Sequence, residues 1–433
     1  MLFIDSKGKV KYRKKKKVDF VFIYEIKNRE IQGISLIGYE LMRRGYTVGY
    51  INTWHATHHA DIRYAARVAV VFGAYNTEVI EFALSFIESC NNVLNMQWEE
   101  LLNDACLDKD SFFMLRGKAS DVYHVSWGKT NKDHLVNTCN IPSEHVRITG
   151  HVGTDFLRRE FRGFYKSKEE IFNEYGLKSD YKLLLFISTF APPNLLEKEF
   201  AEASVESQNM IIQWLVRYAK EHPDTYIIYR PHPTEVLNSQ IKKSIIQCDN
   251  IKVIKDYSIQ QWIVIADTIL NWWSTSLCDI YAAGKTCVFV RPCKIPDRDE
   301  YHLFRKIEMA STYDEMIKMI ELDEPVISKD DMQMYYLFDS DELVYKKIVA
   351  FLEEIYRYKS GLNYYNNNKR KFKERGIILE AREIYGYIKY RLYDLLMGKN
   401  TSAETIYHRQ MMTEYYISER EIIHLINKIK KFI

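Results

Sequence analysis

Short apolar runs alternate with longer amphipathic stretches along most of this chain, and this alternation restricts the possible folds more than any other feature. The pattern is typical of βαβ units, whose strands form a parallel sheet. It occurs in two series. We expect the strands of the first series at residues 18–24, 47–51, 68–73, 92–96, 122–126 and 146–149, and those of the second at 182–188, 226–229, 251–254, 268–271 and 286–290.

Two such series predict an α/β protein with two successive Rossmann-like domains. The 433 residues are too many for one ordinary core, which agrees with two domains and an extension. We expect a basic segment at 1–17, a first domain at 18–160, a second at 161–325 and a helical extension at 326–433, whose first helix would cross back onto the first domain. The strand ends of both domains, where ligands bind, would face a shared cleft.

Composition narrows the possible functions. The net charge of +3 does not indicate a nucleic-acid-binding protein. No apolar run is long enough to span a bilayer. The seven cysteines are scattered without paired spacing, which is typical of reduced cysteines in a cytoplasmic protein. Lysines gather at 14–17 and at 428–431; they predict either peripheral contact with an anionic membrane or only solvated tails.

The strongest local signal is the sequence from Tyr229 to Glu235, where a strand ends in Arg-Pro-His-Pro. The two prolines stiffen this turn and hold Arg230 and His232 at the carboxyl edge of the second sheet. Arginine supplies a charged fork and histidine a donor near neutral pH, so the pair suits a phosphate-bearing leaving group. A rigid turn whose histidine only caps a helix explains the residue types equally well.

A second signal follows the strand at 268–271, where Ser274, Thr275 and Ser276 precede a helix that carries Asp279 in its first turn. Backbone N–H groups, the helix dipole and hydroxyl donors converge at such a start and favour an anion. Taken alone, a capping pair of Ser276 and Asp279 is the simpler explanation. Together with the Arg-Pro-His-Pro turn, a shared phosphate site explains more.

Further polar residues follow other strands of the second series. Ser188 and Thr189 come after its first strand, and Asp256 and Ser258 come after its third. We expect these side chains to contact a base, a ribose or a sugar. Asp256 suits a helix cap equally well.

Charged residues follow two strands of the first series. Glu25, Lys27, Arg29 and Glu30 come directly after its first strand, and Glu99 follows a later one. They would lie where an acceptor approaches. Glu30 also suits the amino-terminal end of a helix, where a negative charge is stabilised.

No metal or cofactor is predicted. His55, His58 and His59 lie close together, but no carboxylate or further histidine completes a metal site. The chain also lacks a Gly-Lys-Ser/Thr phosphate loop and a GxGxxG sequence.

These residues resemble a known group of proteins. In order and spacing, the segment 182–292 resembles the C-terminal half of bacterial surface carbohydrate biosynthesis proteins and, more distantly, CDP-glycerol glycerophosphotransferases and capsule Kdo and sialyltransferases. The matching segments there are 230–233, 256–258 and 274–276; first-domain segments similar to the same group are 27–30, 97–99, 126–128 and 149–150 with Asp155. The helical tail has no counterpart in this resemblance.

The resemblance implies a metal-independent transferase of the GT-B type. His232 with Pro233, and the segment 274–276, would bind the donor phosphate, and donors in such families are often cytidine-activated. A first-domain carboxylate would deprotonate the acceptor, with Glu30 the first choice and Glu99 and Glu25 behind it. The Asp/Glu-Asp-Gly sequence that carries the base in related sialyltransferases is absent here.

The expected function is glycosyl transfer from a nucleotide-activated sugar to a glycan or lipid-linked acceptor, in the synthesis of a bacterial surface polysaccharide such as capsule or O-antigen. A CDP-polyol phosphotransferase of the teichoic-acid type would use the same site. A sugar-nucleotide epimerase-like enzyme would use the same fold without an acceptor. A non-catalytic assembly protein would keep the fold and bind no nucleotide.

Overall fold

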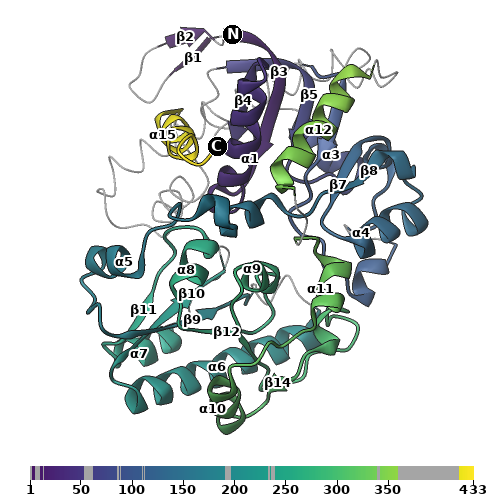
Figure 1. Ribbon diagram of the computed structural model, residues 1–433. Helices are drawn as coiled ribbons and strands as arrows, with labels where there is room; N and C mark the ends of the chain where they lie inside the picture. The colour runs from purple at the N-terminus through teal and green to yellow at the C-terminus, as the bar shows by residue number, and fades with distance from the viewer. Residues whose placement is uncertain are drawn as a thin grey trace. The chain divides into compact units, whose positions relative to one another are not determined.

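The structure, a computed structural model, describes residues 2–4, 10–12, 14–52, 62–84, 87, 89–109, 111, 113–190, 197–232, 235, 239–338, 342–358 and 419–433. They belong to two compact units. Unit 1 comprises Met1–Glu100, Phe112–Val152 and Ser340–Ile433, and unit 2 comprises Leu101–Ser111 and Gly153–Asp339. Each unit contains a six-stranded sheet (Figure 1).

The sheet of unit 1 has the order β4-β3-β5-β6-β7-β8, and all neighbours pair in parallel. Its strands are β3 (Lys14–Tyr24), β4 (Val48–Asn52), β5 (Ile62–Val71), β6 (Asn92–Asn95), β7 (Tyr123–Ser126) and β8 (Val146–Ile148). All six strands expected in the first series are present. β3 starts earlier than expected because Lys14 pairs with Ile62, so the basic residues extend the strand. A separate antiparallel pair joins β1 (Leu2–Ile4) and β2 (Val10–Tyr12).

The helices of unit 1 come from both ends of the sequence. They are α1 (Lys27–Arg43), α3 (Thr77–Leu84), α4 (Lys129–Asp133), α12 (Val344–Arg357) and α15 (Glu419–Ile429), with short turns η2 (Gly117–Asp121), η3 (His134–Thr138) and η4 (Ser143–His145). In α1, Ile34, Ile37 and Leu41 recur at helical spacing and are buried. Gly45 follows this helix in a left-handed conformation, with φ 89°, as glycine does after many helices.

One helix of the extension returns to unit 1. It is α12, whereas α11 (Lys329–Tyr335), which precedes it, belongs to unit 2. The ring of Tyr356 lies 5.5 Å from that of Phe20 in β3, and the buried side chain of Asn92 in β6 donates to the carbonyl of Ile355 at 2.8 Å. A helix of the extension therefore packs on unit 1, but it is the second helix, whereas the sequence had led us to expect the first.

The sheet of unit 2 has the order β11-β10-β9-β12-β13-β14 and is also parallel throughout. Its strands are β9 (Lys182–Ile187), β10 (Thr225–Arg230), β11 (Ile251–Val253), β12 (Thr268–Asn271), β13 (Val288–Val290) and β14 (Met309–Ala310). Five of them were expected. β14 has two residues, too few for an apolar run to reveal it.

The helices of unit 2 include four, α6 to α9, that connect successive strands of the sheet, and others that precede or follow its strands. They are α5 (Lys168–Glu174), α6 (Lys198–Glu221), α7 (Ser239–Ile246), α8 (Ile259–Ile265), α9 (Leu277–Ala282), α10 (Tyr313–Leu322) and α11, with short turns η1 (Asp104–Leu107), η5 (Val152–Leu157), η6 (Arg159–Phe161) and η8 (Phe304–Lys306). The core between α6 and the sheet includes Ile211, Leu215, Leu184 and Ile227. The stretch at 155–180, which precedes the first strand of this sheet, contains only short turns and α5.

The C-terminal helix α15 packs against α1. Lys27 Nζ lies 2.6 Å from Glu421 Oε1, and Lys430 Nζ lies 5.8 Å from the ring centre of Tyr39. Ile429 is fully buried. Ile429 therefore packs on the protein itself. No helix in the described ranges is both long and apolar enough to cross a membrane.

Ile429→Ala should lower the free energy of unfolding by about 2 to 5 kcal/mol, as expected for truncating a buried isoleucine. Ile423 in the same helix is 51% exposed, so Ile423→Ala is the matched control, with an expected change below about 0.5 kcal/mol. Urea titrations of both variants measure the difference. Equally small effects would show that α15 does not stabilise unit 1.

Candidate functional site

The strand order of unit 2 reverses its direction of growth between β9 and β12. In open α/β sheets, ligands bind beside such a point at the carboxyl ends of the strands. The residues predicted to hold the donor follow β9, β10, β11 and β12, so parallel pairing brings their loops to this one edge. This carboxyl edge is the candidate donor site.

A buried carboxylate organises the Arg-Pro-His-Pro turn. Glu235 accepts hydrogen bonds from the backbone N–H of His232 at 3.0 Å, the hydroxyl of Tyr229 at 2.5 Å, the amide of Gln208 at 2.9 Å and the hydroxyl of Ser188. Burial raises the pKa of Glu235, and these hydrogen bonds partly oppose the rise. Glu235 therefore ties the turn after β10 to the end of β9, a role that the sequence analysis did not assign.

Arg230 is bound to the neighbouring loop. Its guanidinium donates to the carbonyls of Asp256 at 2.7 Å, Tyr257 at 2.6 Å and Ile254 at 3.2 Å. Tyr257 has a φ of 64°, which is uncommon for a residue with a side chain and is often found at functional sites. Through its three hydrogen bonds, Arg230 holds the loop after β11 in place.

The two predicted contact residues of that loop differ in environment. The Asp256 carboxylate is exposed and accepts a hydrogen bond from the hydroxyl of Tyr175 at 2.9 Å. Ser258 is the residue at which α8 begins, but its side chain makes no capping hydrogen bond, and it is buried. Asp256 therefore does not cap α8 and is available at the surface.

The side chain of Asn271, at the end of β12, stabilises the turn of residues 274–276. The Asn271 side chain accepts from the N–H of Ser274 at 2.8 Å and donates to the carbonyl of Ser274 at 3.0 Å. Ser274 Oγ accepts from the N–H of Ser276 at 3.2 Å and donates to Ser276 Oγ at 3.0 Å. Ser276 makes no capping bond with its side chain, so the simpler capping pair with Asp279 is absent. Thr275 and Ser276 remain partly exposed.

Arg291 and Thr189 also lie at this edge. The sequence gave no signal for Arg291, whereas Thr189 was expected to contact a ligand. Arg291 directly follows β13, is buried, forms an ion pair with Glu300 and donates to the carbonyl of Trp272 at 2.9 Å. The hydroxyl of Thr189, after β9, is buried and has no hydrogen-bond partner among the described residues. A lone arginine after a strand gives no sequence signal unless its buried partner is known.

In unit 1 the predicted acceptor residues gather around Arg29. Its guanidinium lies 2.7 Å from Glu30, 3.2 Å from Glu99 and 3.6 Å from Glu25. Burial would lower the pKa of Arg29, but the charges of Glu30 and Glu99 outweigh it and raise the pKa. Lys27 belongs to the same helix start and pairs with α15, as described above.

The three carboxylates differ in access. Glu30 is fully buried and accepts from the backbone N–H groups of Glu25 at 2.8 Å and Ile26 at 3.3 Å, so it serves the start of α1. The side chains of Glu25 and Glu99 are 40% and 42% exposed. Burial of the carboxylate raises the pKa of Glu25; Arg29 opposes this, while Glu30 and Glu99 add to it.

Buried polar residues support this edge of unit 1. Gln97, after β6, has a φ of 41°. The rings of Trp98 and Trp127 lie 5.3 Å and 4.6 Å from that of His151, and burial together with the charge of Arg29 lowers the pKa of His151 to about 3. Glu100 accepts from the N–H of Trp127 at 2.5 Å. The sequence analysis gave none of these a role.

His55, His58 and His59 lie outside the described residues, as does Pro233. Within the described ranges, no group of three His, Cys, Asp or Glu side chains is arranged to hold a metal ion.

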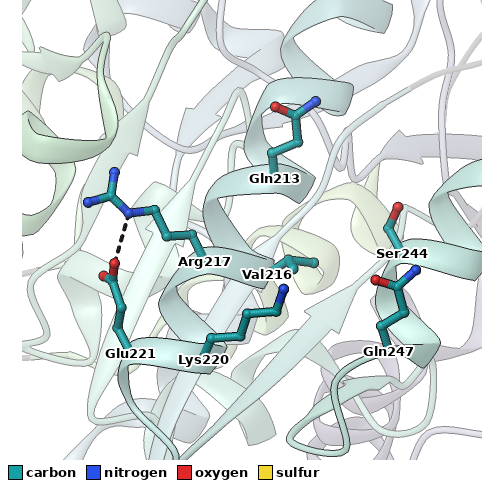
Figure 2. A pocket seen from close by; sticks show the side chains of 7 residues that line it. All are labelled: Gln213, Val216, Arg217, Lys220, Glu221, Ser244 and Gln247. Carbon is teal, nitrogen blue, oxygen red and sulfur yellow. Dashed lines mark hydrogen bonds and ion pairs between the residues drawn. The ribbon is translucent and has the colours of Figure 1, made fainter.

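Unit 2 contains a pocket of about 390 Å³, whose lining residues are drawn in Figure 2. It is lined by Gln213, Val216, Arg217, Lys220, Glu221, Ser244 and Gln247. Arg217 pairs with Glu221 at 2.8 Å across its wall. The end of α6 leads into the start of β10, so this pocket lies toward the amino edge of the sheet. None of the predicted site residues lines it.

No family model matches the sequence, and no curated protein matches it. Solved structures do match. A protein assigned as UDP-N-acetylglucosamine 2-epimerase from Listeria monocytogenes is 13% identical with a TM-score of 0.50, covering 79% of this chain and 97% of that one. MnaA from S. aureus, in a structure with UDP, is 15% identical with a TM-score of 0.50, covering 78% and 96%.

A variant of the wall teichoic acid polymerase TagF, in a structure with CDPG, is 11% identical with a TM-score of 0.52, covering 78% of this chain and 88% of that one. At such identities the likeness concerns the fold. The two parallel sheets with their helices match the GT-B-like two-domain α/β fold of these proteins, and the predicted fold class is confirmed.

Burial raises the pKa of Glu100 well above its ordinary value, and hydrogen bonds from Trp127 and Ser126 oppose this only partly. Above the pKa of the unfolded chain the folded protein keeps this proton while the unfolded chain loses it, so stability falls as pH rises toward the folded pKa. Glu100→Gln should remove that loss, so its stability relative to that of wild type should rise with pH over the range above the ordinary glutamate pKa, by up to about 1.4 kcal/mol per pH unit. Urea titrations across this range measure the stability of both proteins as a function of pH. If the two stability profiles are parallel, Glu100 is ionised in the folded protein.

Proposed function

We propose that this chain is a glycosyltransferase that uses a nucleotide-activated sugar. The observation that carries the proposal is the 274–276 turn. It lies at the reversal of strand order, it is braced by Asn271, and Ser276 makes no capping hydrogen bond with its side chain. The partly exposed hydroxyls of Thr275 and Ser276 are donors that suit a phosphate. His232, held beside β9 through Glu235, would supply a further donor.

The donor is proposed to be cytidine-activated. This part rests on the resemblance of segments 230–233, 256–258 and 274–276 to surface carbohydrate biosynthesis proteins. The structures of MnaA with UDP and of TagF with CDPG agree with a nucleotide ligand on this fold. They differ in the nucleobase, so they do not decide which nucleobase the donor carries. We propose that three residues contact the ribose, nucleobase or sugar. They are Asp256, which is exposed in the loop that Arg230 binds, and Ser188 and Thr189, which follow β9.

In the proposed reaction an acceptor hydroxyl attacks the activated carbon of the donor. A new C–O bond forms, the bond from that carbon to the phosphate oxygen breaks, and the nucleotide leaves with the bonding electron pair. His232 and the donors of the 274–276 turn stabilise the departing phosphate. Arg230 acts on this site by positioning the 254–257 loop.

The acceptor proton is proposed to go to a carboxylate of unit 1. Glu30 was the first choice from sequence, but it is buried and bound to the start of α1, so it serves better as support. Glu25 is partly exposed and has a raised pKa, which suits a general base. Glu99 is equally exposed and remains the second choice. Arg29 holds all three carboxylates together.

The cellular role proposed is the assembly of a bacterial surface polysaccharide on the cytoplasmic side of the membrane. It rests on the resemblance and on the exposed Lys16 and Lys17, which suit peripheral contact with anionic lipid. The acceptor would then be a glycan or a lipid-linked glycan.

A CDP-polyol phosphotransferase is the second candidate, favoured by the fold shared with TagF at a TM-score of 0.52. The same residues would hold the donor, but attack would occur at phosphorus and a phosphodiester would form. Analysis of the product separates the two: a glycoside has lost the donor phosphate, and a phosphodiester retains one. An epimerase-like activity would alter the nucleotide sugar without any acceptor.

Calorimetry with CMP, CDP, UDP and GDP tests the donor site. We expect binding of at least one nucleotide, weakened about tenfold or more in His232→Ala because a charge-assisted contact to phosphate is lost. Combined Ser274→Ala and Ser276→Ala should weaken binding less, since the hydroxyl of Thr275 remains. Ser179→Ala, at an exposed serine before β9, is the control and should bind as wild type does. Unchanged affinity in the site variants would refute the assignment.

Glu25→Gln tests the base. We expect kcat to fall by about 10² to 10⁴, the usual contribution of general base catalysis, with the thermal midpoint unchanged. Glu30→Gln should instead lower stability by about 1 to 3 kcal/mol, because a buried acceptor of two backbone N–H groups is weakened. Full activity of Glu25→Gln, together with loss of activity in Glu99→Gln, would transfer the role to Glu99.

A further inference from the structure

The carboxyl group of Asp279 lies close in sequence to the 274–276 turn and has no role in the reaction proposed above. Asp279, in the first turn of α9, is buried and accepts hydrogen bonds from the side chains of Gln260 and Tyr336. Its Oδ1 atom has no partner among the described residues. A buried carboxyl with an unpartnered oxygen is costly, so its retention needs a reason.

The partners of Asp279 join the two loops of the candidate donor site. α9 starts directly after the 274–276 turn, and Gln260 lies in α8, which starts directly after Ser258. Tyr336 follows α11 and is itself buried. The carboxyl group of Asp279 therefore links the helices that follow β11 and β12, both within unit 2.

No cation acts on this carboxyl group among the described residues. Burial raises the pKa of Asp279 from 3.8 to about 7, and hydrogen bonds from Gln260 and Tyr336 lower it only in part. The titratable groups facing it are the phenols of Tyr165 and Tyr336, whose pKa values burial raises. Asp155 and Cys278 act electrostatically on Tyr336. Near neutral pH the phenols stay uncharged while Asp279 can gain or lose its proton.

We infer that Asp279 is a positioning residue that couples binding of the donor phosphate at the 274–276 turn to a proton. The neutral carboxyl group leaves the start of α9 receptive to an anion, and the ionised carboxylate opposes the anion. The inference rests on the proposed function of that turn.

The physical basis is the repulsion of two negative charges in a medium that screens them weakly. Asp279 lies one helical turn from Ser276, whose partly exposed hydroxyl belongs to the proposed phosphate site. Linkage is reciprocal: a bound phosphate must raise the affinity of Asp279 for its proton by the same factor as the proton favours the phosphate. Nucleotide binding near neutral pH should therefore take up protons.

Titration calorimetry of the full chain with CMP and with UDP tests this. Measurements near pH 7 in two buffers with different ionisation enthalpies give the number of protons taken up. We expect uptake of a fraction of a proton by wild type and clearly less by Asp279→Asn. Across about pH 6 to pH 8, the affinity of wild type should fall about fivefold or more relative to that of Asp279→Asn. His232 is present in both proteins, so the difference isolates Asp279.

Tyr336→Phe separates this role from a merely structural one. Loss of a donor to the carboxylate raises the pKa of Asp279 further, so the pH midpoint of binding should move to higher pH. A structural role would weaken binding equally at every pH and leave the midpoint in place. This variant also keeps the test open if Asp279→Asn does not fold.

The outcomes of these measurements distinguish this inference from the proposed function. Binding by wild type with the same proton uptake in Asp279→Asn overturns this inference alone and leaves the donor site intact. A midpoint unmoved in Tyr336→Phe likewise overturns it. Absence of any nucleotide binding by wild type overturns the proposed function and this inference together.

Discussion

Parallel pairing around β3 and β9 is the constraint on which both candidate sites depend. Residues 20–24 of β3 and 183–187 of β9 are apolar and buried, so the polar side chains of the carboxyl edge are those that follow the strands. In a parallel sheet all carboxyl ends meet at one edge. The polar residues are consequently collected at that edge in each unit, although they are far apart in sequence.

Buried carboxylates then hold these edges in shape. Glu235 joins the ends of β9 and β10, and Glu30 closes the start of α1. Each of them satisfies several donors at once, which offsets the cost of burying a carboxyl group. Residues that were attractive as chemical groups in the sequence thus act as supports, while partly exposed neighbours such as Glu25 and Ser276 remain available to ligands.

The sequence was sufficient for the sheet pattern because strand burial leaves a direct trace in the order of apolar residues. It located eleven strands, five of them in unit 2, and the two turns of the candidate donor site. It could not show that Arg230 binds the carbonyls of the 254–257 loop, because backbone acceptors carry no residue identity. It also could not choose among Glu25, Glu30 and Glu99, since exposure depends on packing.

The return of α12 has a consequence for the order in which the protein is made. Unit 2 has its complete strand sequence on the ribosome before α12 is synthesised, whereas β3 and β6 must wait for that helix. Domains generally fold as units during synthesis. At that stage the nascent chain carries all six strands of the first sheet but not α12, so Phe20 and Asn92 lack their partners, whereas the strands of the second sheet are all present.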